Sequence, residues 1–559
     1  MSLRNRIILP VIISALAVLS GCGGTSNPVV TPPPSGSFTN SNLTGTYVFS
    51  VSGTMADSAN DFVTIMGAFT ADGKGNITGG VIDQNSTAGN SLILEANITS
   101  GTYSVGPDGR PTGSPTVPTG LITLQTAAAT FQFDYVLTSS EHGLVTEFDN
   151  FGSASGTLDL QSTVTQANID SQSFAFNFSG ASGFNTVLCN VSIGTPVVIP
   201  YSTVGDFTLD ANGSISAGLE DFNNNCVSSG STSVPVTGGS VSLTAGATFG
   251  TATISTTVSG TTTTYKFDVF PIDATHLKFI EVDPLPIVAG DAFTQASSIP
   301  TGNNVYTVAG FDNSATVGGP FTAAGILHAD GSGNILSDSV QDINDAGVAS
   351  EVSVTGTYSS VTGGRAELTL SGFINGNGGI GCSGCLFAVY PSSGGLQMLE
   401  IDNGGMTNGI AYPQTATTLA SGEGYGMNLS GATSSTSEDD IAEFTNNNGA
   451  FSGIIDVNDQ GSTNFKNTFS ANYAADSTVA GRGTVTPSNN GYIMTTYVVD
   501  SSTAVAVSTD PSLVALGALV KQNATAKSSA IANHLTVLSI RPSVRTKAAM
   551  KKAPPTRSK

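Results

Sequence analysis

The segment Phe69-Thr-Ala-Asp-Gly-Lys-Gly-Asn-Ile77 has the pattern of two short β-strands joined by a tight turn. Asp, Gly and Asn supply the left-handed backbone positions that such a turn requires, and the flanking residues alternate between apolar and polar. The pattern returns in residues 207–215, in residues 327–335 and, more loosely, in residues 444–451. A hairpin that recurs every ~120 residues predicts four copies of one β unit.

Two further elements recur with the hairpin. An opening strand precedes each copy, in residues 47–53, 174–180, 306–310 and 425–431, and a glutamine closes each unit, at Gln161, Gln295, Gln414 and Gln522. In the first unit about eight short strands follow one another through tight turns, with no convincing helix. This order of elements predicts an antiparallel meander.

We therefore predict an all-β chain of four tandem antiparallel meander units, each an about eight-stranded barrel. Eight strands can close on themselves, which removes the sheet edges and leaves an interior that holds side chains or one small ligand. The units loosely resemble lipocalin-like and avidin-like barrels, without a motif specific to either. Immunoglobulin-like sandwiches are the alternative, although their spaced cysteine pair and core tryptophan are missing.

The N-terminal residues have the features of an export signal. A basic start precedes an apolar run in residues 7–19, which is too short to span a bilayer unaided. The run ends in Leu19-Ser20-Gly21-Cys22, which resembles the lipobox of bacterial lipoproteins and implies cleavage before Cys22 and lipidation of that cysteine. In that family an aspartate at the next position favours the inner membrane, so Gly23 indicates the outer membrane or cell surface.

These patterns divide the chain into seven segments. Four prolines make the residues after Cys22 a partly stiff tether that holds the body off the lipid. The predicted boundaries are 1–21 for the signal peptide, 22–37 for the tether, 38–161, 171–295, 303–414 and 422–522 for the β units, and 523–559 for a basic, disordered tail.

Charge is unevenly distributed along the chain. It carries 18 Lys and Arg against 40 Asp and Glu, a formal net charge of -22, and only seven of the basic residues lie between the leader and Lys521. An acidic body repels phosphate, so we expect no nucleic-acid partner. The basic tail is suited to anionic envelope polymers or lipid headgroups, or to folding back on the acidic body.

An Asp-x-Asn pattern follows the second hairpin strand of every unit. Residues i and i+2 of an extended chain point the same way, so two oxygen ligands are able to converge on calcium. The alternative is an Asx turn at the end of a strand, which the sequence favours. The candidate metal ligands are Asp83, Asn85, Asp221, Asn223, Asp342, Asn344, Asp456 and Asn458.

A Glu-x-Asp pattern occupies the penultimate strand of three units and decays to Ser508 and Asp510 in the fourth. Paired carboxylates are used in glycoside hydrolysis. A solvated strand face explains them without chemistry, and three copies of a catalytic site in one chain are unusual. The candidate ligand carboxylates are Glu147, Asp149, Glu281, Asp283, Glu400 and Asp402.

Cysteine and histidine are scarce. An exported chain meets an oxidising compartment, so Cys189 with Cys226, and Cys382 with Cys385, are expected to form disulfides rather than redox or zinc sites. His142 and His276 fall in the same hairpin of two units and are expected to be turn residues. No nucleophile elbow, phosphate loop or dinucleotide motif is present.

The sequence thus predicts an exported, lipid-anchored envelope protein and no enzyme. We expect a binding or structural scaffold built from repeats, with the membrane as partner through Cys22 and with a glycan, an anionic polymer or a small ligand as a further partner. No cofactor is expected apart from calcium. The alternatives are a secreted hydrolase that uses the paired carboxylates and a passive adhesin or spacer.

Overall fold

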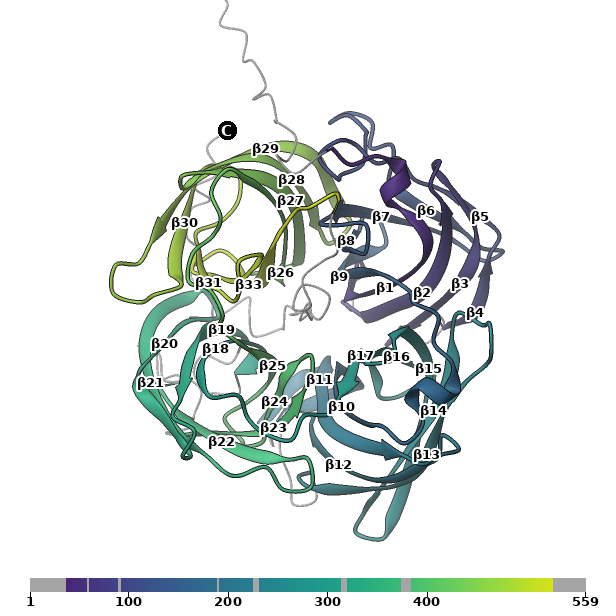
Figure 1. The fold of residues 1–559 in the computed structure, drawn as a ribbon, viewed down its shortest axis with the longest axis vertical. Helices are drawn as coiled ribbons and strands as arrows, with labels where there is room; N and C mark the ends of the chain where they lie inside the picture. The colour runs from purple at the N-terminus through teal and green to yellow at the C-terminus, as the bar shows by residue number, and fades with distance from the viewer. Residues whose placement is uncertain are drawn as a thin grey trace, which may run out of the picture.

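The computed structural model describes residues 37–57, 60–88, 92–188, 191–224, 231–312, 319–372 and 384–525, with the side chains of 184–197 left aside. The fold prediction is confirmed, because these residues form four closed antiparallel barrels, the first of nine strands and the other three of eight (Figure 1). Two short helices, η1 (Asn40–Asn42) and α1 (Gln166–Ile169), precede the first and second barrels. None of the described helices is long and apolar enough to cross a membrane.

Barrel 1 is closed by the pairing of β2 with β3, and β4 and β5 pair with successive parts of β3. Its strands are β1 (Thr44–Met55), β2 (Phe62–Asp72), β3 (Asn76–Ser86), β4 (Ile93–Ile98), β5 (Ser100–Thr102), β6 (Ile122–Gln125), β7 (Thr130–Leu137), β8 (His142–Glu147) and β9 (Gly152–Leu160).

Barrels 2 to 4 each close in the order of their strands. Barrel 2 contains β10 (Ser173–Leu188), β11 (Val191–Leu209), β12 (Ile215–Asn223), β13 (Val234–Leu243), β14 (Gly250–Val258), β15 (Thr261–Asp273), β16 (His276–Glu281) and β17 (Ile287–Thr294). Barrel 3 contains β18 (Gly302–Asp312), β19 (Pro320–Ala329), β20 (Asn334–Asp345), β21 (Val348–Tyr358), β22 (Ala366–Ser371), β23 (Cys385–Ser392), β24 (Gly395–Glu400) and β25 (Gly405–Pro413). Barrel 4 contains β26 (Glu423–Ala432), β27 (Ser437–Asn447), β28 (Ala450–Asp459), β29 (Ser462–Ala475), β30 (Arg482–Asn489), β31 (Met494–Val498), β32 (Thr503–Ser508) and β33 (Val514–Lys521).

The hairpin that predicted the repeat forms by the expected chemistry. Asp72 accepts the backbone N–H groups of Lys74 at 2.7 Å and Asn76 at 3.0 Å, and Gly73 and Gly75 take φ values of 73° and 106°. Asp210 and Asp330 accept the equivalent N–H groups in barrels 2 and 3. Each turn joins two strands whose apolar side chains point into their own barrel, so the barrel interiors are filled cores.

The barrels are arranged in a closed ring (Figure 1). The first three strands of one barrel pack against the last three strands of the next, and barrel 4 packs in the same way against barrel 1. Apolar clusters fill these contacts, including Val48, Met66, Phe270 and Ile280 between barrels 1 and 2. A head-to-tail contact repeated around an axis makes a ring when its rotation closes, and this one closes after four units.

The two ends of the described chain meet where the ring closes. The Asn42 side chain donates to the carbonyl of Ala524 at 2.8 Å, and Ala524 belongs to the core of barrel 1. This contact between barrels 4 and 1 has no covalent connection, unlike the other three. Noncovalent contacts therefore hold the ring closed at this point, among them the backbone hydrogen bond from the Asn523 N–H to the Thr138 carbonyl at 2.7 Å.

Candidate functional site at the seams between barrels

We call the four contacts between neighbouring barrels seams 1–2, 2–3, 3–4 and 4–1. The Asp-x-Asn motif of one barrel meets the Glu-x-Asp strand of the next at three seams, and at seam 3–4 it meets the equivalent strand that carries Ser508 and Asp510. The asparagine amide donates to the backbone carbonyls at the end of that strand, and its side chain is at most 2% exposed. The bonds run from Asn85 to Glu281 (2.7 Å) and Asp283 (3.0 Å), from Asn223 to Glu400 (2.9 Å) and Gly405 (3.0 Å), from Asn344 to Ser508 (2.9 Å), Asp510 (3.1 Å) and Leu513 (3.0 Å), and from Asn458 to Glu147 (2.7 Å) and Gly152 (2.8 Å).

The aspartate of the motif forms an ion pair across three of the seams. Arg365 donates two hydrogen bonds to the Asp221 carboxylate, from Nε at 2.6 Å and from Nη2 at 3.0 Å. The Tyr390 hydroxyl donates to the same carboxylate at 2.6 Å. Arg482 and Tyr497 hold Asp342 in the same manner, with arginine distances of 2.8 and 2.9 Å. A two-pronged guanidinium–carboxylate contact is among the stronger polar interactions in proteins, and it fixes orientation as well as distance.

Seam 4–1 uses an arginine from a different place in its barrel. Arg110 comes from the loop before β6 and pairs with Asp456, and both side chains are fully buried. Asp456 also accepts the backbone N–H of Lys466. These aspartates and asparagines thus lie in the interfaces with most of their polar atoms engaged. Asn344 and Asn458 also accept the backbone N–H groups of Gly347 (3.0 Å) and Gly461 (2.7 Å), so an Asx-type turn of the predicted kind is present at these two positions.

Seam 1–2 departs from this pattern. Phe249 precedes β14 as Arg365 precedes β22, and Phe270 holds in β15 the position that Tyr390 holds in β23. The two phenylalanine rings stack with centroids 5.6 Å apart. Asp83, which is 0% exposed, accepts the backbone N–H of Glu95 at 2.5 Å, and burial raises the pKa of its carboxyl to about 7.

The glutamines that close the units also reach across the seams. The Gln161 amide donates to the carbonyls of Thr248 and Pro271 at 2.7 and 2.8 Å, and Gln414 donates to Val498 at 2.9 Å. Gln522 donates to Asp108 and Leu137 at 2.8 and 2.9 Å. Gln295 turns instead to Asp206 in its own barrel at 3.1 Å. The repetition of glutamine was visible in the sequence, but this role was missed there.

The glutamates of the Glu-x-Asp motif lie inside the barrels, so the predicted solvated strand face was wrong. Glu147, Glu281 and Glu400 are at most 4% exposed, and each pairs with a core phenylalanine on the neighbouring strand. Burial, followed by the charge of the neighbouring aspartate, raises the pKa of each well above its ordinary range. The aspartates accept strand or turn N–H groups, Asp149 from Phe151 (2.8 Å), Asp283 from Lys266 (3.1 Å) and Asp402 from Leu386 (2.7 Å).

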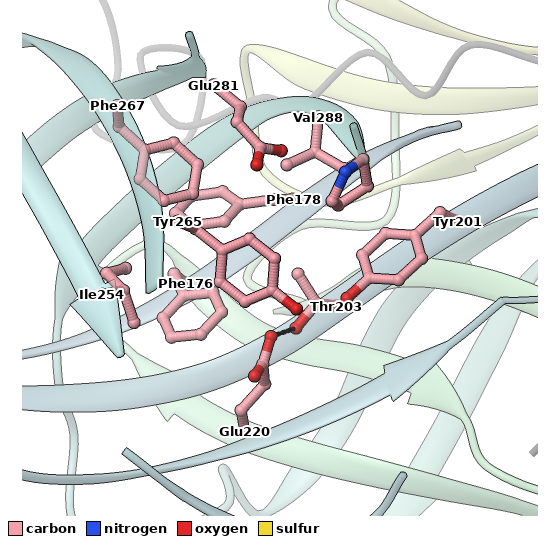
Figure 2. Close-up of a pocket in the computed structure, with 11 residues that line it drawn as sticks. Phe176, Phe178, Tyr201, Thr203, Glu220, Ile254, Tyr265, Phe267, Glu281 and Val288 are labelled. Carbon is pink, nitrogen blue, oxygen red and sulfur yellow. Dashed lines mark hydrogen bonds between the residues drawn. The ribbon is translucent and has the colours of Figure 1, made fainter. Parts of the chain in front are cut away.

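A small cavity lies beside Glu281 inside barrel 2 (Figure 2). Phe176, Phe178 and Tyr265 line it together with Glu220, whose carboxylate accepts the Thr203 hydroxyl at 2.7 Å. Its volume is about 10 Å³, which is room for about one water molecule. A sugar ring does not fit there, so the cavity offers no support for glycoside hydrolysis by Glu281.

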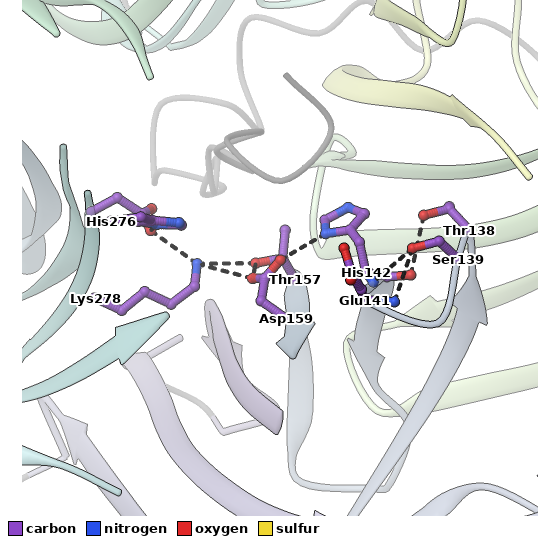
Figure 3. Close-up of polar contacts among 9 residues, drawn as sticks. Thr138, Ser139, Glu141, His142, Thr157, Asp159, His276 and Lys278 are labelled. Carbon is purple, nitrogen blue, oxygen red and sulfur yellow. Dashed lines mark hydrogen bonds and ion pairs between the residues drawn. The ribbon is translucent and has the colours of Figure 1, made fainter. Parts of the chain in front are cut away.

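The two histidines belong to a buried polar network at seam 1–2 (Figure 3). His142 contacts Asp159 at 2.7 Å, His276 contacts Asp291 at 2.7 Å, and Lys278 lies between the two carboxylates at 3.6 and 2.9 Å. Burial acts to raise the pKa of Asp291, but the Lys278 ammonium and His276 hold it below its usual range. The expectation of turn residues was wrong, because both histidines begin strands, have side chains that are at most 2% exposed and are paired with carboxylates.

Of the five cysteines, the described residues include Cys385 alone. Cys385 is buried and disulfide-bonded, so it supplies no thiolate to the nearby Glu400 and Asp402 carboxylates. Cys22, Cys189, Cys226, Cys382 and His534 lie outside the described residues. The pairing of the cysteines and the lipidation of Cys22 remain predictions.

Comparison with known proteins gives no family. No family model matches the chain, and none of the curated proteins matches it. Among solved structures, one match is a mutant of the vaccine antigen transferrin-binding protein B of Haemophilus parasuis, at 9% identity over 70% of this chain and 86% of that one. Its TM-score is 0.18, and this likeness carries no argument about function.

Proposed function

We propose that this protein is an exported, lipid-anchored scaffold of the cell envelope. The observation that supports the proposal is the closed ring, in which the repeated polar residues are used to fix the barrels against one another. The barrel interiors are filled by their own side chains. Such a body presents surfaces at fixed distances and angles, which suits a scaffold that binds a partner at several points.

The direction of the strands gives the ring two different faces. In every barrel the first strand begins where the last strand ends, as the pairings Tyr47–Leu160 and Tyr425–Lys521 show. Gln161 reaches the end of β15 from this side, so the barrels share one orientation. The chain enters at residue 37 and leaves at residue 525 on this face. A tether at Cys22 would turn this face to the membrane and the opposite face outward.

The anchor is tested by changing Cys22 to Ala in the producing cell. We expect the wild-type chain to incorporate labelled fatty acid and to sediment with membranes, and the Cys22→Ala chain to do neither. Ser26→Ala, a change in the tether, is the matched control and should behave as wild type. Equal membrane association of both chains without label would contradict the lipid anchor.

Binding is tested on the purified full chain by thermal unfolding with glycans, anionic envelope polymers and apolar small molecules. A ligand that binds only the folded chain raises its stability by RT ln(1 + [L]/Kd). We expect a shift with at least one polymeric ligand. A chain truncated after Thr525, which keeps Gln522 and Ala524 in the contact between barrels 4 and 1, separates binding by the ring from binding by the basic tail. If no ligand shifts the full chain, the passive spacer becomes the better proposal.

A further inference from the structure

Two buried acids line the small cavity inside barrel 2. Glu281 is fully buried and Glu220 is 3% exposed, and they reach the cavity from opposite sides (Figure 2). Within the described part of the chain, both carboxylate oxygens of Glu281 and Oε2 of Glu220 have no hydrogen-bond partner. Burying a polar atom without a partner is costly. These three oxygens therefore form a group of acceptors that lacks a donor.

The second acid is particular to barrel 2. Glu220 directly precedes the Asp-x-Asn motif, and the same position holds Ile82 in barrel 1 and Ile455 in barrel 4. In barrel 3 it holds Gln341, whose side chain accepts the Tyr306 hydroxyl and donates to a backbone carbonyl at 3.0 Å. Three barrels thus form without this carboxylate, so its presence in barrel 2 indicates a role other than folding.

Aromatic rings form much of the remaining wall. Phe176 and Phe178 stack with centroids 4.7 Å apart, Phe178 lies 5.4 Å from Phe267, and the rings of Tyr201 and Tyr265 also line the cavity. The described residues of the wall include no lysine, arginine or histidine. The faces of aromatic rings attract organic cations. The wall therefore combines two acids with aromatic surface and has no positive charge of its own.

The size of the cavity fits the head of an amine. Its volume is about 10 Å³, which is the space of about one water molecule. A primary ammonium group has one nitrogen atom of similar size and three N–H donors, as many as the oxygens that lack a donor here. A calcium ion requires six to eight oxygen ligands, which two carboxylates in so small a space do not supply.

The cavity lies toward the face of the ring opposite the chain ends. Strand β16 starts with His276 opposite Phe293, near the end of the last strand of barrel 2, and runs from there to Glu281. Pro286 lines the cavity, and the neighbouring Leu285 is 54% exposed. The wall on this side thus continues into an exposed apolar residue, which suits the alkyl chain of a ligand whose head lies inside.

We propose that barrel 2 binds the primary ammonium group of a small alkylamine between Glu220 and Glu281, with the alkyl chain directed toward the face opposite the chain ends. The three N–H groups donate to the three carboxylate oxygens, and the aromatic rings surround the charge. The proposal does not depend on the lipid anchor, because the site lies within one barrel. A failure of the anchor experiment would leave it unaffected.

The test uses the purified full chain at pH 8, above the value of about 7 to which burial raises the pKa of Glu220. The chain is titrated with n-butylammonium chloride while calorimetric binding and thermal unfolding are followed. Tetramethylammonium chloride, which has no N–H donor, and sodium chloride are the comparisons at equal ionic strength. We expect n-butylammonium to bind at one site per chain and to raise Tm, and the two comparison salts to do neither.

Glu220→Ile introduces the side chain that barrels 1 and 4 have at this position. We expect it to weaken amine binding by about tenfold or more, because it removes a charged acceptor. Gln341→Ile, the matched change in barrel 3, should keep the amine response. If Glu220→Ile does not fold, Glu220→Gln keeps the shape of the side chain, removes its charge and should weaken binding in the same way.

Three results would overturn the proposal. The first is a wild-type chain that binds no n-butylammonium. The second is an equal shift in Tm with tetramethylammonium or sodium, because the N–H donors then play no part. The third is a folded Glu220 variant that binds the amine as tightly as the wild type, because the ligand then lies elsewhere.

Discussion

The ion pair between Arg110 and Asp456 should be the polar contact on which closure of the ring depends most. It joins barrels 4 and 1, the one pair of neighbouring barrels that no linker connects directly, and both side chains are fully buried. Changing Arg110 to Met keeps an unbranched apolar stem, although a shorter one, and leaves Asp456 in a buried place without its cation. Removing one partner of a buried pair costs about 3–5 kcal/mol.

The double variant Arg110→Met with Asp456→Leu separates the charge from the packing. Replacing both partners of a buried pair by apolar residues is often close to neutral. Here one backbone donor, the N–H of Lys466, also loses its acceptor, which costs about 1–3 kcal/mol. We therefore expect the double variant to be less stable than wild type by about 1–3 kcal/mol and more stable than Arg110→Met.

Far-ultraviolet circular dichroism in urea is the suitable assay, because the chain has no tryptophan. Small-angle X-ray scattering on the same samples reports whether the ring has opened, and we expect a larger radius of gyration for Arg110→Met alone. The reasoning is refuted if Arg110→Met loses less than about 1 kcal/mol, or if the double variant is no more stable than the single one.

Two further changes test the barrel and its seam. Gly156→Ala should lower Tm strongly, because a Cβ there would lie 1.6 Å from the Ser50 carbonyl oxygen. Gly238→Ala is the control and should leave Tm nearly unchanged, because a Cβ there has no atom within 4 Å. Equal Tm values for the two variants would contradict this prediction. Burial raises the pKa of Glu443 from 4.5 to about 8, so stability is full below pH 4.5 and declines as pH rises toward 8. Glu443→Gln should flatten that decline in urea unfolding across this range, and an unchanged pH profile would contradict the assignment.

The barrels were predictable because their signal is local. The alternation of apolar and polar residues on either side of a turn such as Asp72-Gly73 indicates which side chains point into a barrel. The internal repeat indicates that the same unit occurs four times. The covering of the outer faces was not predictable in this way. Period-two alternation distinguishes two faces of a strand but does not tell whether another unit covers the second one.

The same limit explains the errors at the candidate sites. Asn458 and Glu147 were recognised as members of two separate repeated motifs. In the structure they are hydrogen-bonded across a seam, although 311 residues separate them in the sequence. Arg110 could not be aligned with Arg365 because it comes from a loop of different length. Strand β16 illustrates this limit: it reads His-Leu-Lys-Phe-Ile-Glu, in which three polar residues favour one exposed face, yet all six positions are buried because another barrel covers the second face.

Closure of the ring fixes the number of repeats, because every barrel needs a neighbour on both sides. Four seams close the ring, so we expect a variant with three or five units to leave one set of seam residues facing solvent. Gene duplication or deletion would then change solubility and assembly before it changed any affinity. For the same reason the chain could begin and end at any of the four seams, with a linker in place of the present ends. A circular permutant that joins residues 37 and 525 and opens the chain at residue 298 should form the same ring, while its termini leave from a different barrel.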